Sequence, residues 1–372
     1  MAGTGTTDCA RLRLRVHLTN VTAPGPAQVV QSLLPALEHC PGAQVAEIYL
    51  PDRGELAGYE RHASGPAPRR YRRLLPAPLS RVLECSVLAR RFDGETLLVL
   101  GDVPLACRAR QVVFVQTVHL ASDVRSPDWR TAVKNSVGRW LIRRNARRVS
   151  TFIVQTDVMQ ALLEQTYPQT RHKIMVIPQP PPAWLLESGL QRTGRVASAG
   201  ERLDLFYPAA SHPHKNHELL ARIRAADAAD WPLRRLTLTI APAANPNRTV
   251  EWIHCAGFLP PAEMLANYGR TDGVLFLSKA ESYGMPLVEA MRVGLPVIAP
   301  DLPYARTLCG EQALYFAPDD AESLRQATVE LRQRLGSGWW PDWSGRLSTI
   351  PATWAEVAGR FLQVAATGVT PR

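Results

Sequence analysis

The sequence predicts an α/β protein made of two doubly wound domains in tandem, each built on a parallel sheet. Short apolar runs alternate with longer helix-like segments in both halves of the 372-residue chain, and such alternation is typical of parallel sheets. It is interrupted by a stretch rich in proline, glycine and serine, PQPPPAWLLESGLQRTGRVASAGER. We therefore expect a first domain at 1–185, a linker at 186–202, a second domain at 203–350 and a last helical segment at 351–372.

Six strands are expected in the first domain. RLRLRVHL, which contains the first of them, alternates arginine with apolar residues, a period of two. The runs LLVL and VVFVQ are almost continuously apolar, as parallel strands buried on both faces are. The expected strands are 12–18, 46–50, 96–100, 112–116, 151–155 and 173–178, and the clearest helices are 26–38 and 128–148.

The second domain repeats this pattern. Its expected strands are 203–207, 236–240, 250–256, 273–278, 296–300 and 313–317, and its helices are 214–228, 261–270, 285–293 and 320–335. TWAEVAGRFLQVAA is amphipathic and predicts a final helix. Ligands of such sheets bind beyond the carboxyl ends of the strands. A cleft between two domains of this kind would suit a reaction with two substrates.

Composition restricts the location of the protein. No run approaches the roughly 18 apolar residues that a membrane-spanning helix needs. The N-terminal stretch MAGTGTTDCARLRLRVHL lacks the long apolar core of a signal peptide, so we expect a cytoplasmic protein. The six cysteines show no CxxC spacing, which favours reduced, mostly buried thiols over a disulfide framework or a zinc site.

Positive charge is concentrated in the first half of the chain. Residues 1–200 hold 26 Lys and Arg against 15 Asp and Glu, a net charge of +11, whereas residues 201–372 hold 17 and 18, a net charge of −1. A basic domain beside a neutral one indicates an anionic partner, such as nucleic acid, acidic lipid or a phosphorylated substrate. The alternative is that arginine, far commoner here than the four lysines, only keeps the surface soluble.

The stretch ESYGMPLVEAMRVGLPVIAPD, from Glu281 to Asp301, carries the clearest chemical pattern. Gly284 permits close approach of a ligand to the backbone, and Pro286 suits the first turn of a helix. The helix N-terminus would attract a phosphate. A diphosphate there, with Glu281 on one side and Glu289 on the other to bind sugar and ribose hydroxyls, describes a nucleotide-sugar site. Alternatively, both glutamates are surface or capping acids.

This stretch resembles the Glu-x7-Glu signature of glycosyltransferase family 4, whose members are retaining enzymes of the GT-B fold, with two Rossmann-like domains that face a central cleft. The similarity extends from VEWIHCAGF through FAPDDAESLRQAT, and ATWAEVA resembles the start of the C-terminal helix that crosses back to the first domain in that family. The resemblance implies a donor site formed by Glu289, Ser282, Tyr283, Gly284, Met285, Pro286, Leu287, Gly257 and Gly25.

The resemblance also implies three catalytic residues. Lys215, in YPAASHPHKNHELL, matches a lysine that contacts the donor diphosphate, and Glu281 would hold the transferred sugar. His119 matches a histidine near the sugar and the acceptor. The family arginine five residues before the lysine is replaced by Ala210, and His212, His214 or His217 are its possible substitutes. The same histidines could form a metal site, but they lack a nearby acidic or cysteine partner.

The basic segment GRWLIRRNARRVS predicts a helix with arginines among apolar residues and tryptophan. Such a helix can lie on an acidic membrane surface, contact an anionic acceptor directly, or simply be a solvated helix that covers a sheet. The candidate contacts at the inner face of the cytoplasmic membrane are Arg139, Arg143, Arg144, Arg147 and Arg148.

The leading hypothesis is a retaining hexosyltransferase. It would move a sugar from a nucleoside diphosphate donor to a lipid-linked, lipopolysaccharide or other cell-surface glycan acceptor, with no cofactor and no obligatory metal. One alternative is a sugar-nucleotide epimerase of the same fold. The other is a non-catalytic protein that binds membranes or nucleic acid through its basic half; because both glutamates and Lys215 are present, no nucleic-acid partner is expected.

Overall fold

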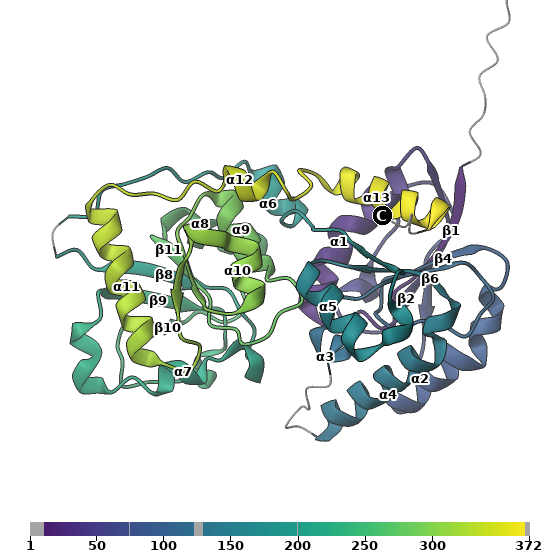
Figure 1. The fold of residues 1–372 in the computed structure, drawn as a ribbon, viewed down its shortest axis with the longest axis horizontal. Coiled ribbons are helices and arrows are strands. Elements are labelled where there is room, and N and C mark those ends of the chain that lie inside the picture. The colour runs from purple at the N-terminus through teal and green to yellow at the C-terminus, as the bar shows by residue number, and fades with distance from the viewer. Residues whose placement is uncertain (1–10, 74, 123–128, 199, 369–372) are drawn as a thin grey trace, which may run out of the picture. The chain divides into compact units, whose positions relative to one another are not determined.

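The computed structural model describes residues 11–73, 75–122, 129–198 and 200–368 (Figure 1). Its contacts separate two units. Unit 1 comprises Met1–Gln179 together with Pro351–Arg372, and unit 2 comprises Pro180–Ile350. Each unit holds one sheet whose recorded strand pairs are all parallel, so the predicted α/β class with two parallel sheets is confirmed.

The unit 1 sheet has seven strands in the order β3-β2-β1-β4-β5-β6-β7. Its central strands are almost wholly buried because helices cover both faces of a parallel sheet. The short edge strand β3, with the sequence RRY, was not predicted, because it has no apolar run and pairs only with β2. The strands are β1 (Leu12–His17), β2 (Ala43–Pro51), β3 (Arg69–Tyr71), β4 (Thr96–Val99), β5 (Gln111–Phe114), β6 (Val149–Val154) and β7 (Ile174–Val176).

The helices of unit 1 include a segment from the far end of the chain. Helix α13 (Trp354–Thr367) packs against α1 (Pro24–His39), and the Phe361 ring meets Phe114 of β5 edge to face, with 5.3 Å between ring centroids. The Thr353 side chain caps α13 by accepting a hydrogen bond from the Glu356 N–H. The other helices are α2 (Ala77–Ser86), α3 (Val118–Ala121), α4 (Trp129–Asn145) and α5 (Asp157–Thr166).

The unit 2 sheet has six strands in the order β10-β9-β8-β11-β12-β13. The strands are β8 (Leu203–Tyr207), β9 (Leu233–Leu238), β10 (Ile253–Cys255), β11 (Gly273–Leu275), β12 (Val297–Pro300) and β13 (Leu314–Phe316). The helices are α6 (Ala183–Ser188), α7 (Glu218–Ala221), α8 (Pro261–Arg270), α9 (Met285–Val293), α10 (Pro303–Cys309), α11 (Ala321–Gly336) and α12 (Ser344–Leu347).

The segment interpreted as a linker is held against unit 2 at several points. Leu185 of α6, the last residue assigned to the first domain from the sequence, is buried in the unit 2 core. Further along, the Arg192 N–H donates to the Val293 carbonyl over 2.7 Å. Arg195 forms an ion pair of 2.7 Å with Asp272, which itself accepts from a backbone N–H of β8. Most of this segment is therefore part of the unit 2 surface.

The predicted continuous helix 214–228 is wrong. The chain there forms a 3₁₀ turn at Pro213–Lys215, the single turn of α7, and a second 3₁₀ segment at Ala225–Asp230. Asn216 interrupts the helix because its backbone is left-handed, with φ of 57°, and its side chain donates to the Pro318 carbonyl. The Asn247 side chain donates to the Leu220 carbonyl of α7 and to the Ile223 carbonyl just beyond it, which stops the helix.

Two expectations concern location and cysteine chemistry. Among the described residues, no helix is both long enough and apolar enough to cross a bilayer. Cys85, Cys107, Cys255 and Cys309 are buried free thiols and Cys40 is partly exposed, as the sequence predicted. The first ten residues, with Cys9, lie outside the described residues, as does Asp128 at the start of the predicted helix 128–148.

Replacing Phe361 by alanine should destabilise unit 1, because the ring is fully buried against β5. A buried Phe→Ala change costs about 3–5 kcal/mol. Urea unfolding followed by circular dichroism should show an earlier transition for unit 1, while the unit 2 transition stays in place. The capping variant Thr353→Ala should move the same transition by only about 1 kcal/mol. Equal shifts of both transitions would contradict the assignment of α13 to unit 1.

Candidate functional site

The candidate site lies in unit 2, where two neighbouring strands end. Strand β8 leads into the loop that carries Lys215, and β11 leads into the loop that carries Glu281. Because β8 and β11 are parallel and adjacent, both loops leave the same edge of the sheet. They meet in an ion pair of 2.5 Å between Lys215 Nζ and Glu281 Oε1. Both side chains are largely buried, with 15% and 12% of their surface exposed.

Hydrogen bonds hold the two loops in register. The His214 carbonyl accepts from the Lys279 N–H over 2.8 Å and from the Ser278 hydroxyl over 3.1 Å. The buried Tyr207 hydroxyl, at the end of β8, donates to the Lys215 carbonyl over 2.7 Å. Tyr304 of α10 donates to the Ser278 carbonyl. The ion pair therefore sits on a backbone that neighbouring elements fix, as a site that positions a substrate requires.

The loop after Glu281 turns directly into helix α9, as predicted. Gly284 is the residue before the helix and has a left-handed backbone, with φ of 96°. A Cβ at Gly284 would lie 3.1 Å from Leu287 Cδ1, so the turn is both strained and crowded for any other residue. The first turn contains Met285, Pro286 and Leu287, and Gly294 ends the helix at φ of 87°. The positive end of the α9 dipole therefore lies in this loop.

The residues assigned to the donor differ in exposure. Ser282, Met285 and Pro286 are partly exposed, whereas Tyr283 and Leu287 are buried. Gly257 follows β10 with φ of 80°, and nothing lies within 4 Å of the position that a Cβ would take. Tyr283 and Leu287 therefore pack inside unit 2 in this structure, whereas Gly257 leaves open space beside the backbone.

Glu289 is buried inside unit 2, with 2% of its surface exposed. It faces Tyr268 of α8, whose hydroxyl donates to Glu289 Oε2 over 2.5 Å. Burial raises the pKa of Glu289 to about 7, against the lowering effect of that hydrogen bond. The role of this carboxylate at a ribose stays a prediction; in this structure its one recorded hydrogen-bond partner is the tyrosine.

Gly25 and His119 belong to unit 1 and are described separately. Gly25 lies in the first turn of α1, has no left-handed backbone and has open space around it. Its backbone is therefore helical and does not form a loop of the glycine-rich type. His119 lies in the single turn of α3, partly exposed, and its carbonyl accepts from Arg139 Nη1 over 3.2 Å. Their proposed roles stay predictions.

The histidines around Lys215 do not gather around a common point. His212 and His214 stack on each other with 5.6 Å between ring centroids, while the buried His217 packs on Tyr207. Burial, together with the charge of Lys215, lowers the pKa of His217 to about 4, so this ring is neutral at pH 7. Among the described residues, no group of three His, Cys, Asp or Glu side chains is placed to hold a metal ion.

Three tyrosines of this region were not assigned as site residues from the sequence: Tyr207, Tyr268 and Tyr304. Each is buried and each donates a hydrogen bond to a candidate residue or its loop. No spacing pattern connects them to Lys215, Glu281 or Glu289, because they come from β8, α8 and α10. A buried tyrosine requires a hydrogen-bond partner, but the sequence does not tell which one.

The raised pKa of Glu289 predicts a pH dependence of unit 2 stability. The folded state holds the proton up to about pH 7, whereas the unfolded chain releases it near 4.5. Stability should therefore fall as pH rises between these two values, by up to about 3 kcal/mol. Glu289→Gln removes this titration and should unfold at higher urea than the parent at pH 8, with little difference at pH 4.5. The exposed Glu251→Gln should keep the parent's pH profile; an unchanged profile in Glu289→Gln would contradict the burial argument.

The sequence comparisons point to one family. The family model described as Glycosyl transferases group 1 matches residues 202–334. The serotype-specific mannosyltransferase WbdA of Escherichia coli is 36% identical over 69 residues, which are 18% of this chain and 8% of WbdA. The O-antigen chain mannosyltransferase RfbU of Salmonella typhimurium is 21% identical over 253 residues, 64% of this chain and 67% of RfbU. The chain thus spans only a small part of WbdA.

Solved structures match over nearly the whole chain. Sucrose-phosphate synthase from Thermosynechococcus elongatus superposes with a TM-score of 0.66 and 14% identity, covering 96% of this chain and 98% of its own. HepE of Anabaena, solved with UDP and glucose, superposes with a TM-score of 0.62 and 13% identity, covering 96% and 100%. At such identities the likeness establishes the fold. The chain therefore has the GT-B fold, and its residues 202–334 are similar to the group 1 glycosyltransferases.

Proposed function

We propose that the protein is a retaining glycosyltransferase that takes a hexose from a nucleoside diphosphate sugar. The observation that carries this proposal is the ion pair of Lys215 and Glu281 beside the N-terminus of α9. A cation and a helix N-terminus suit a diphosphate, and a carboxylate suits sugar hydroxyls. The site therefore combines groups that suit the diphosphate and groups that suit the sugar of a nucleotide-sugar, at the carboxyl edge of one sheet.

In this proposal donor binding exchanges the partners of the ion pair. Lys215 turns its ammonium from Glu281 to the diphosphate, and Glu281 is released to accept hydrogen bonds from the transferred sugar. The largely buried position of both side chains strengthens each new interaction relative to water. As the diphosphate leaves, Lys215 stabilises its growing negative charge. No metal is needed for this step.

The transfer replaces one bond by another. The bond between the anomeric carbon and the diphosphate oxygen breaks, the acceptor oxygen bonds to the same face of that carbon, and the acceptor proton passes to the leaving diphosphate. His119 would contact the sugar and the acceptor. NMR of the product would contradict retention if its anomeric configuration were inverted relative to the donor.

The named activities of WbdA and RfbU favour mannose as the transferred sugar and an O-antigen or lipopolysaccharide glycan as the acceptor. The HepE structure, with UDP and glucose, supports a nucleoside diphosphate in the donor site. We assign the acceptor to unit 1, which carries the excess of positive charge. GDP-mannose is therefore the first donor to test, beside UDP-sugars and ADP-sugars.

A donor nucleotide should stabilise the protein against heat. A ligand that binds only the folded form, at about 100 times its dissociation constant, adds about 2.7 kcal/mol. Differential scanning fluorimetry with UDP, GDP, ADP and their sugars should show one preferred nucleotide. Lys215→Ala and Glu289→Ala should lose the shift, whereas Arg248→Ala, an exposed cation elsewhere in unit 2, should keep it. No shift at millimolar concentrations of any nucleotide would refute the proposed donor site.

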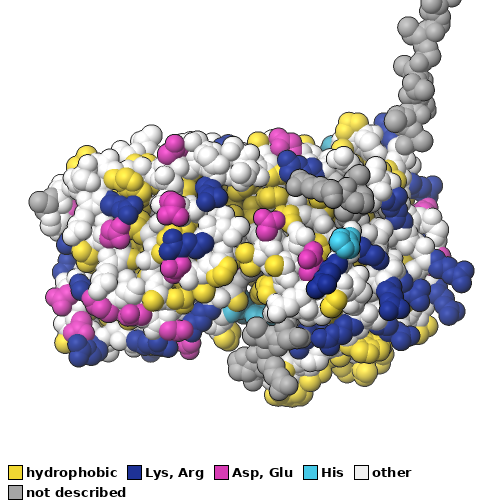
Figure 2. Space-filling model, in the orientation of Figure 1, with side chains coloured by type: hydrophobic (Ala, Val, Ile, Leu, Met, Phe, Trp, Pro, Cys, Tyr) yellow, Lys and Arg dark blue, Asp and Glu magenta, His cyan; other side chains and the backbone are white. Residues whose placement is uncertain are grey.

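We also propose that unit 1 contacts acidic membranes, by a surface that differs from the arginine set expected from the sequence. Arg139 donates to two backbone carbonyls and Arg143 stacks on Tyr167, so both are engaged by the protein. Exposed apolar side chains lie instead on α2 and α4, which pack against each other. Figure 2 shows hydrophobic side chains gathered over these two helices, with Lys and Arg beside them. They are Leu79, Leu83, Trp129, Val133 and Trp140, together with Val87 directly after the end of α2.

These six residues, called the apolar face, have the spacing of single helix faces. Leu79, Leu83 and Val87 are four positions apart, and Trp129 and Val133 likewise. Leu79 is 60% exposed and Trp129 is 69% exposed. Arg144 lies over the Trp140 ring, with 5.7 Å to the ring centroid, and Arg147 and Arg148 are exposed nearby along the chain. Apolar side chains flanked by cations fit the interface of an anionic bilayer.

Vesicle sedimentation should test this surface. The protein should bind vesicles that contain phosphatidylglycerol more tightly than neutral vesicles, and less tightly as salt rises. Leu79→Ser combined with Trp129→Ser should weaken binding roughly tenfold or more, since each exposed residue would lose its burial in lipid. Phe258→Ser is the matched control, because Phe258 is 80% exposed but belongs to unit 2. Equal loss in both variants would argue against the apolar face.

A further inference from the structure

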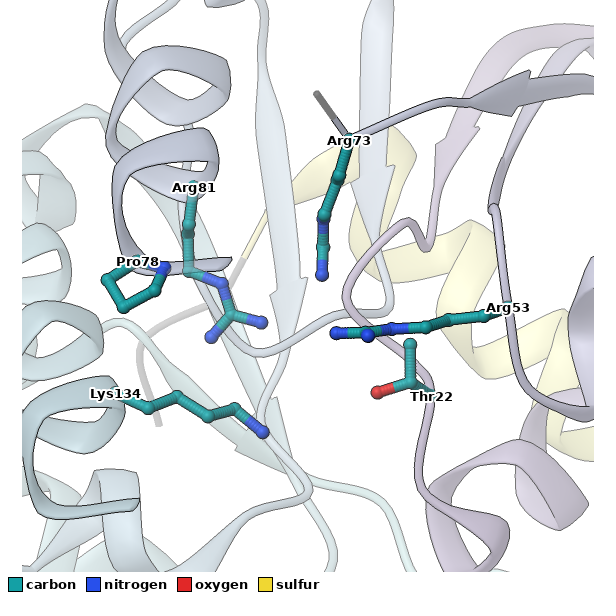
Figure 3. A pocket seen from close by; sticks show the side chains of 6 residues that line it. All are labelled: Thr22, Arg53, Arg73, Pro78, Arg81 and Lys134. Carbon is teal, nitrogen blue, oxygen red and sulfur yellow. The ribbon is translucent and has the colours of Figure 1, made fainter. Parts of the chain in front are cut away.

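A small cavity in unit 1 is surrounded by cations. It lies where β1, β2 and β3 end: Thr22 follows β1, Arg53 follows β2 and Arg73 follows β3. Helices α2 and α4 add Arg81 and Lys134 from the opposite side. Figure 3 shows the three guanidinium groups and the Lys134 ammonium directed toward the same space. The four side chains are called the cation cluster below.

The cation cluster lacks compensating carboxylates. Among the described residues, no Asp or Glu oxygen lies within ion-pair distance of Arg53, Arg73, Arg81 or Lys134. Elsewhere in unit 1 arginines do find such partners: Arg15 pairs with Glu95 over 2.8 Å. The cluster is therefore not simply a consequence of a basic sequence. Four like charges around one cavity repel each other, and the charges of Asp102 and Glu84 offset this only in part at Arg81, whose pKa stays lowered.

The nearby carboxylates are already engaged. Asp102 is partly buried and accepts hydrogen bonds from the Gln116 and Thr117 N–H groups and from the Thr117 hydroxyl. Glu84 accepts from His17 and Thr19. Neither can turn toward the cavity without giving up these bonds, so neither neutralises the cluster at short range.

Arg81 shows most clearly that hydrogen-bond donors face the cavity. Only 7% of its surface is exposed, and burial, with the charge of Arg73 adding to it, lowers its pKa. Its Nε donates to Asn20 Oδ1 over 3.1 Å, and the same oxygen accepts from Arg73 over 2.7 Å. Within the described part of unit 1, the two terminal nitrogens of Arg81 make no recorded hydrogen bond. The fully buried side-chain nitrogens without a partner do not include these two, so they are accessible from the cavity, where an anion can accept hydrogen bonds from them.

The size and chemistry of the cavity match a tetrahedral oxyanion. It offers about 60 Å³ to the centres of water-sized groups, and one such group needs roughly 10–15 Å³. Three guanidinium groups and one ammonium provide planar and point-charge donors, the combination that recognises phosphate. The Thr22 hydroxyl lines the same space.

We propose that the cation cluster binds a phosphoryl group of the acceptor substrate. That the phosphoryl group belongs to an acceptor, rather than to another ligand, rests on the proposed glycosyltransferase function. The phosphoryl group can be carried by a lipid or by a soluble glycan. The helices that supply Arg81 and Lys134 also carry the apolar face, so a lipid attached to the phosphate could reach a bilayer from this cavity.

Binding of inorganic pyrophosphate, followed by isothermal titration calorimetry at constant ionic strength, tests the cation cluster. Arg81→Met and Lys134→Met should each weaken binding roughly 10- to 100-fold, the effect of one lost hydrogen bond to a charged group. Arg144→Met makes the same charge change on α4 outside the cavity and should bind as the parent does. Lys215→Ala distinguishes binding at the donor site from binding at the cation cluster. Pyrophosphate binding that depends on Lys215 and not on Arg81 overturns the proposal. The absence of any binding at millimolar pyrophosphate also overturns it.

A second comparison distinguishes the two carriers of the phosphoryl group. Farnesyl diphosphate in detergent micelles should bind more tightly than pyrophosphate if the acceptor is lipid-linked, and equally if the acceptor is soluble; farnesol should not bind through Arg81 in either case. If Arg81→Met weakened the binding of farnesol as much as the binding of the diphosphate, a phosphoryl site would be refuted.

The test is independent of the donor experiment. If pyrophosphate binding depended on Arg81 but no nucleotide raised the melting temperature, the anion site would be supported and the proposed glycosyltransferase function would be refuted. If a nucleotide raised the melting temperature but pyrophosphate binding did not depend on Arg81, the proposed function would stand and the proposed anion site would be refuted. Circular dichroism of Arg81→Met and Lys134→Met should match the parent, so that lost binding is not lost folding.

Discussion

The parallel arrangement of both sheets is the constraint on which the rest of this structure depends. In a parallel sheet every strand ends at the same edge, so the loops that follow neighbouring strands are brought together however far apart they lie in sequence. In unit 2 this places Lys215 beside Glu281, 66 positions apart. In unit 1 it places Arg53 and Arg73 around one cavity with Thr22. Both candidate sites are therefore products of the same topological rule.

The two edges differ in charge, and the difference suits two kinds of ligand. At the unit 2 edge Lys215 is already paired with Glu281, so a ligand must displace Glu281 from Lys215. The freed carboxylate can then accept hydrogen bonds from the ligand. At the unit 1 edge Arg73 and Arg81 share the neutral oxygen of Asn20, and none of the four cations has a carboxylate at ion-pair distance in the described chain. The first arrangement favours a ligand with both phosphate and hydroxyl groups. The second favours an anion alone.

Burial gives Glu289 a different character from Glu281, although the sequence motif treats them alike. Glu281 is compensated by an ammonium, whereas Glu289 has only the Tyr268 hydroxyl and a pKa near 7. A carboxyl group of this kind is poised between its neutral and charged forms at physiological pH. A ribose that reached it would find a good acceptor only when the proton is absent. Tyr268 would therefore influence the proposed ribose contact of Glu289, because its hydroxyl donates to that carboxyl group.

The amino-acid sequence by itself determined the fold class, most strands, and the loop-to-helix turn from Glu281 through Gly284 to α9, because apolar periodicity and glycine and proline placement are local signals. It did not determine the break at Asn216, the edge strand β3, or the three tyrosines, because each depends on a partner distant in sequence, such as Pro318 for Asn216. The cation cluster was visible only as a basic half of the chain with a basic segment from Arg69 to Arg91, which includes Arg73 and Arg81. Tertiary structure decided which arginines converge, since the position of a charge in space follows from the packing of strands and helices and not from its neighbours in sequence.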